Sequence, residues 1–138
     1  MVVLLLVLST VFGVVAYWRF TRSDRYLAAA LREMKAEGTP PSPEDCVDRV
    51  LRWRDHCEAM QSLCDASVPR MMEACLRCSD QGGYCRGLGS AFMATQFGVP
   101  QCRERKLDRP HKKICALSYR AIATHCERLG AAVRKDIP

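Results

Sequence analysis

No lysine or arginine precedes Arg19, and the residues from Val2 to Trp18 carry no charge at all. A cleaved signal peptide normally starts with basic residues and ends in small ones, and this run does neither. We therefore expect its 17 residues to be retained as a membrane segment. As a helix they would be roughly 26 Å long, which just spans a bilayer core. Tyr17 and Trp18 stand where interfacial aromatic residues are expected.

The motifs of common hydrolytic centres are also missing. No serine is framed by glycines, no His-Glu-x-x-His occurs, and the carboxylates are scattered over positions expected to face solvent. Aromatic residues make up only 7% of the chain, and none interleaves with its densest basic run, Arg103–Lys113. We expect no enzyme activity, no cofactor, no nucleic acid and no small-molecule substrate. The basic run could instead face anionic lipid, face an acidic partner, or simply be solvated.

No alternation of period two persists anywhere in the chain, which predicts an all-α protein. We expect a single N-terminal transmembrane helix followed by a small disulfide-stapled bundle of three or four helices. The predicted parts are a transmembrane anchor at 1–22, a juxtamembrane helix and Pro-rich spacer at 23–41, and a cysteine-rich helical domain at 42–138. The juxtamembrane helix could also simply prolong the membrane helix.

Capping signals and apolar spacing predict the helices of the domain. Ser42-Pro43-Glu44-Asp45 is a strong helix start. Apolar positions then step by four and three residues as far as Cys64, which predicts one unbroken helix. A turn at 65–67 leads to a second helix that ends at Gly82-Gly83, and Ser90–Phe97 is a weaker third segment. The fourth helix starts near Pro110, with Cys115, Tyr119, Ile122, Cys126, Leu129 and Val133 on one face. The expected core also includes Trp53, Met71, Met72, Phe92, Met93 and Phe97.

Nine cysteines lie between Cys46 and Cys126, and the anchor has none. So dense a cluster favours an oxidising compartment such as a periplasm, an extracellular face or an intermembrane space. Five basic residues at 19–38 follow the apolar run, and the positive-inside rule would put the domain in the cytoplasm. We give the cysteines more weight. The apolar run begins at residue 2, so a start further upstream could add a basic region before the run, and the positive-inside rule would then no longer favour the cytoplasm.

A helical hairpin with its turn near residue 66 places Cys57 opposite Cys75 and Cys46 opposite Cys85, so we predict these two nested disulfides. A competing register pairs Cys46 with Cys75 and Cys57 with Cys64, and needs a longer loop than the helix signals suggest. Cysteines Cys64, Cys78, Cys102, Cys115 and Cys126 remain. By count alone, Cys126 could reach Cys64 and Cys115 could reach Cys78, which leaves Cys102 as the free thiol.

Ten residues separate Cys46 from Cys57, and nine separate Cys75 from Cys85. These spacings resemble those of the coiled-coil-helix-coiled-coil-helix proteins of the mitochondrial intermembrane space. The resemblance covers about forty residues and implies the same nested pairing.

Two alternatives use the thiols chemically. Cys75-Leu76-Arg77-Cys78 has the Cys-x-x-Cys spacing of thiol–disulfide redox proteins, although it falls late in a predicted helix. A set of Cys75, Cys78, Cys85, His56 and His125 could bind zinc or cuprous copper.

The main expectation is a membrane-anchored structural or interaction protein. It would act as an accessory subunit or scaffold of a membrane or envelope complex. It would contact lipid through the N-terminal helix and a protein partner through the cysteine-rich domain.

Overall fold

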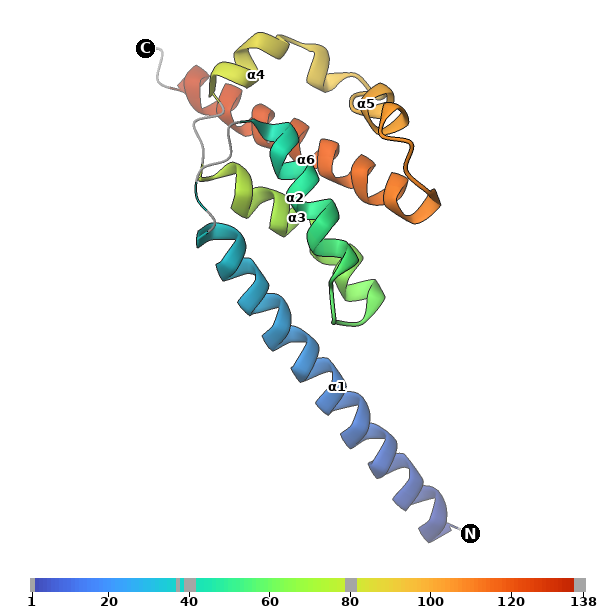
Figure 1. Cartoon of the computed structure of the whole chain (residues 1–138). Coiled ribbons are helices and arrows are strands. Elements are labelled where there is room, and N and C mark those ends of the chain that lie inside the picture. The colour runs from blue at the N-terminus through green and yellow to red at the C-terminus, as the bar shows by residue number, and fades with distance from the viewer. Residues whose placement is uncertain (1, 37, 39–41, 79–81, 136–138) are drawn as a thin grey trace.

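A computed structural model describes residues 2–36, 38, 42–78 and 82–135, with side chains as far as Gly130. Over these ranges the chain forms six α-helices, one short 3-10 helix and no strand, which confirms the all-α prediction. The elements are α1 (Val2–Ala36), α2 (Pro43–Asp55), α3 (Gln61–Leu76), α4 (Gly82–Leu88), η1 (Ala91–Met93), α5 (Val99–Glu104) and α6 (Arg109–Lys135) (Figure 1).

The apolar N-terminal segment and the region predicted as a juxtamembrane helix form one helix, α1, of 35 residues. Every side chain from residue 2 to residue 20 is exposed, and this half projects away from the other helices (Figure 1). It is long and apolar enough to cross a membrane. In the other half, Ser23, Ala30 and Met34 are buried on one face. The same helix therefore provides both the apolar projection and part of the domain core.

Helix α3 lies in the centre of the bundle and packs against α1, α2 and α6. Contacts at both ends give the directions: Ser23 of α1 meets Met60 just before α3, and Lys35 meets Cys78 just after it. Helices α1 and α3 therefore run parallel. Seven side chains of α3 are buried: Cys64, Val68, Met71, Met72, Ala74, Cys75 and Leu76. Because helices cover it on three sides, its apolar residues are not confined to one narrow stripe.

The predicted start of the first domain helix is confirmed. Ser42 is the N-cap of α2, its Oγ accepts from the Asp45 amide at 3.3 Å, and Pro43 stands in the first turn. The side-chain cap pairs one of the amides that lack a partner at a helix start, and proline has no amide to leave unpaired there.

The prediction of an unbroken helix to Cys64 is wrong. Helix α2 ends at Asp55, and α3 begins at Gln61 after a loop. Two bonds from α1 hold this loop: the Tyr26 hydroxyl donates to the His56 carbonyl at 3.1 Å, and the Met60 amide donates to Ser23 Oγ at 3.4 Å. The residues predicted as a turn, 65–67, lie inside α3. Apolar spacing continues across the loop, so periodicity alone does not reveal the break.

The predictions for residues 82–104 also need correction. Gly82-Gly83 opens helix α4 and does not end a helix, while the Ser90–Phe97 segment contains only the single 3-10 turn of η1. Helix α5 follows from Val99. These short elements lie along α6 (Figure 1).

Helix α6 agrees with its predicted pattern. It begins at Arg109, and Asp108 Oδ1 accepts from the His111 amide at 3.1 Å, as a capping residue does. Cys115, Tyr119, Ile122 and Cys126 are buried as expected, and Leu129 is partly buried; the side chain of Val133 lies outside the described ones.

Most of the other predicted core residues are confirmed. Met71 and Met72 are fully buried, and Trp53, Phe92 and Phe97 are partly buried against the core. Met93 is the exception, because 63% of it is exposed on η1.

Candidate functional site

The disulfides of the first hairpin follow the competing register and correct the nested prediction. Cys46 bonds Cys75 and Cys57 bonds Cys64. The reason is the early end of α2: with the turn at residues 56–60, Cys57 lies within the loop and meets Cys64 in the first turn of α3. The opposing faces of the hairpin then bring Cys46 to Cys75.

The remaining pairs also differ from the prediction. Cys85 bonds Cys126 and Cys102 bonds Cys115, so α4 and α5 are each bonded to α6. Cys78 is the free thiol, in place of Cys102. It is half-buried, and its Sγ donates to the Ala74 carbonyl at 3.3 Å and the Lys35 carbonyl at 3.5 Å.

The residues of the proposed metal and redox sites do not form one cluster in this structure. Cys75 and Cys85 are bonded to different partners, and Cys78 stands alone. Within the described ranges no three His, Cys, Asp or Glu side chains are grouped as metal ligands. His56 Nδ1 lies 2.9 Å from the Arg52 carbonyl, while burial, then Arg128, lowers the pKa of His125.

Ion pairs fasten α6 along the length of α3. Near the start of α3, Asp65 accepts from Arg54 at 2.7 Å and Lys113 at 3.2 Å. Burial raises the pKa of Asp65, but these two cations outweigh it and leave the pKa below its usual value. Near the end of α3, Glu73 accepts from Arg128 and Arg77, each at 2.8 Å, and these bonds lower its pKa. Helix α6 therefore also runs parallel to α3.

His111 joins the end of α2 to the start of α6. Its two ring nitrogens face Asp55 and Asp108, and these carboxylates raise the pKa of the imidazole above its ordinary value near 6.5. The contact is partly exposed, so we expect it to stabilise the fold by less than about 1 kcal/mol.

The pH dependence of this contact is testable with His111→Gln. The pKa of His111 is higher in the folded protein than in the unfolded chain, so protonation of this imidazole favours the folded state. The stabilisation is complete at pH values below the unfolded-state pKa, and it is lost as the pH rises through the folded-state pKa. The wild-type protein should therefore exceed the variant in free energy of unfolding at pH 5.5 by more than at pH 8.5. Urea unfolding at both pH values measures this difference, and an equal gap at both would contradict the ion pair.

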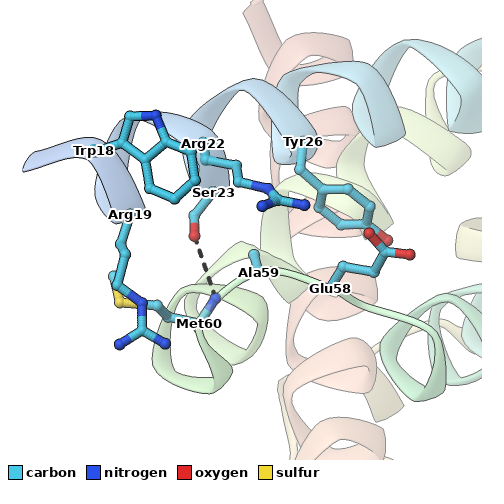
Figure 2. A pocket seen from close by; sticks show the side chains of 8 residues that line it. All are labelled: Trp18, Arg19, Arg22, Ser23, Tyr26, Glu58, Ala59 and Met60. Carbon is cyan, nitrogen blue, oxygen red and sulfur yellow. Dashed lines mark hydrogen bonds between the residues drawn. The ribbon is translucent and has the colours of Figure 1, made fainter. Parts of the chain in front are cut away.

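A pocket of about 270 Å³ lies where the projecting half of α1 leaves the bundle (Figure 2). We call it the α1 pocket. One wall is α1 and the other is the loop between α2 and α3. Its lining is Trp18, Arg19, Arg22, Ser23, Tyr26, Glu58, Ala59 and Met60.

A second concave surface runs beside α6, and we call it the α6 groove. Two adjoining hollows of about 250 and 370 Å³ share Phe97, Val99 and Ala116. The floor also includes Phe92 and Leu117, and the basic residues at the rim are Arg103, Lys112, Lys113 and Arg120. Lys113 pairs with Asp65, while Arg103, Lys112 and Arg120 form no ion pair with any described residue.

The fold and these surfaces define an all-α, disulfide-bonded, cysteine-rich domain that continues one candidate membrane helix. Comparison of the chain with models of protein families, with characterised proteins and with solved structures finds no match.

Sequence reasoning identified part of each surface. Trp18 is predicted at the end of the membrane segment with basic residues after it, and Arg103–Lys113 is the densest basic run of the chain. The opposite wall of the α1 pocket was missed, because Glu58 to Met60 were predicted inside a helix. Apolar residues continue at helical spacing across this loop, so their periodicity does not reveal it.

Proposed function

We propose that this protein is a membrane-anchored scaffold or accessory subunit of a membrane complex. The continuity of α1 carries the proposal: residues 2–18 carry no charge and are exposed, while Ser23, Ala30 and Met34 of the same helix are buried in the domain. A helix shared in this way holds the domain in one orientation at the membrane surface. The domain then lies on the oxidising side, a location that the four disulfides support.

The α6 groove supplies the surface for a protein partner. Its apolar floor and three basic side chains that form no ion pair with a described residue, Arg103, Lys112 and Arg120, complement an amphipathic helix with acidic residues beside its apolar face. The stretch of α6 from residue 112 to residue 123 measures roughly 16 Å, or about three turns of a bound helix.

This proposal predicts the behaviour of the protein in native membranes. It should stay in the membrane after an alkaline carbonate wash, and after mild solubilisation it should migrate in a native gel as a complex much larger than the 15.5 kDa chain. The triple variant R103E/K112E/R120E should weaken that complex by at least about a hundredfold, because like charges then face the acidic partner.

The matched control is R52E/R70E/R86E, which reverses three exposed arginines outside the groove. It should leave the complex intact. Extraction by carbonate would overturn the anchor, whereas equal loss of the complex in both triple variants would overturn the groove as the partner site.

A further inference from the structure

If α1 spans the membrane, the α1 pocket lies at the depth of the lipid headgroups. The inference drawn from this pocket therefore rests on the proposed membrane anchor. Trp18 ends the apolar run, and tryptophan side chains favour the boundary between acyl chains and headgroups. The pocket opens beside this ring and extends toward Tyr26 and the α2–α3 loop (Figure 2). The lipids that surround α1 therefore reach it directly.

The charges in the pocket are of both signs. Arg19 and Arg22 come from α1, and Glu58 comes from the loop (Figure 2). None of the three forms an ion pair with a described residue. The combination of two cations and one anion suits a ligand that carries both a negative and a positive group, because the Glu58 carboxylate would offset part of the attraction for a purely anionic ligand.

We propose that the α1 pocket binds the phosphoethanolamine headgroup of a phospholipid. The guanidinium groups of Arg19 and Arg22 donate to the phosphodiester, a pairing that guanidinium geometry favours. The Glu58 carboxylate accepts from the primary ammonium. The acyl chains lie along the apolar, exposed half of α1, next to the exposed Met60.

The state of the Trp18 ring favours ethanolamine over choline. A quaternary ammonium has no N–H to donate to Glu58, so its recognition depends on the faces of aromatic rings. The face of Trp18 already holds the Arg22 guanidinium, whose central carbon lies 5.7 Å from the ring centroid. A primary ammonium needs no aromatic face, because its hydrogen bonds to a carboxylate are sufficient.

Native mass spectrometry of the full chain, released from detergent with equal amounts of phosphatidylethanolamine, phosphatidylcholine and phosphatidylglycerol, tests this assignment. Phosphatidylethanolamine should be retained about tenfold more than either other lipid. Glu58→Gln should abolish its preference over phosphatidylcholine, and Arg22→Gln should reduce retention of both. Arg25→Gln is the control, since Arg25 is an exposed residue of α1 outside the pocket.

Two results would overturn the assignment. One is equal retention of the three lipids by the wild-type protein. The other is displacement of the lipid by millimolar inorganic phosphate, which would make the pocket a site for free phosphate. Retention is measured in detergent, so these results are independent of the carbonate wash that tests the anchor.

Discussion

Replacement of both Cys85 and Cys126 by alanine should lower the free energy of unfolding by about 4 kcal/mol, the largest effect of any single disulfide here. The two residues are 41 apart in sequence, and cross-linking a longer loop removes more entropy from the unfolded chain. This bond also holds the short helix α4 on α6, where few other contacts fasten it. Urea unfolding of the full chain in mild detergent, followed by circular dichroism, measures the loss.

The matched control is the double alanine variant of Cys57 and Cys64, which are only 7 residues apart. Its expected cost is about 2 kcal/mol. A loss for C85A/C126A no greater than that of C57A/C64A would contradict the pairing. As a further check, the wild-type protein unfolded without reductant should react with one maleimide, and Cys78→Ala with none.

Replacement of Gly98 by alanine should cost about 3 kcal/mol. Gly98 has φ +81°, a left-handed conformation that strains any residue with a Cβ. A Cβ here would also overlap the Cβ and Cγ atoms of Tyr119. Tyr119 cannot easily yield, because it is 1% exposed and its ring packs edge-on against Phe97 at 5.7 Å.

Gly87→Ala provides the control for this variant. Gly87 lies within α4, and a Cβ there would meet nothing within 4 Å. Alanine is the better helix former, so this variant should gain up to about 1 kcal/mol. Thermal unfolding of the two variants under the same conditions compares them, and a stability of G98A within about 0.5 kcal/mol of wild type would disprove the close approach of α5 to α6.

The helix start at Ser42-Pro43 and the buried face of α6 were predictable because their causes are local. A side-chain cap and a proline act within one turn, and an amphipathic face is a property of residues three and four positions apart. Both features appear in the structure at the predicted residues.

The disulfide pairing was not predictable from the same information. It depends on where α2 ends, and that end is held by Tyr26 and Ser23 of α1, about thirty residues or more away in sequence. The helical spacing of apolar residues continues through the loop, so the sequence fits one long helix and two shorter helices equally well. Because the turn lies at residues 56–60 and not near residue 66, the partners of Cys46, Cys57, Cys64 and Cys75 differ from the predicted ones.

The sequence by itself determined the helical class, the apolar segment at 2–18 and the concentration of cysteines in the domain, since each depends on composition or short-range spacing. Only the tertiary structure decided which cysteines pair, that Cys78 remains free, and that Glu58 lines the same pocket as Arg19 and Arg22. These features arise where segments distant in sequence meet. Their positions follow from how α1, α3 and α6 pack together, which no local pattern of residues encodes.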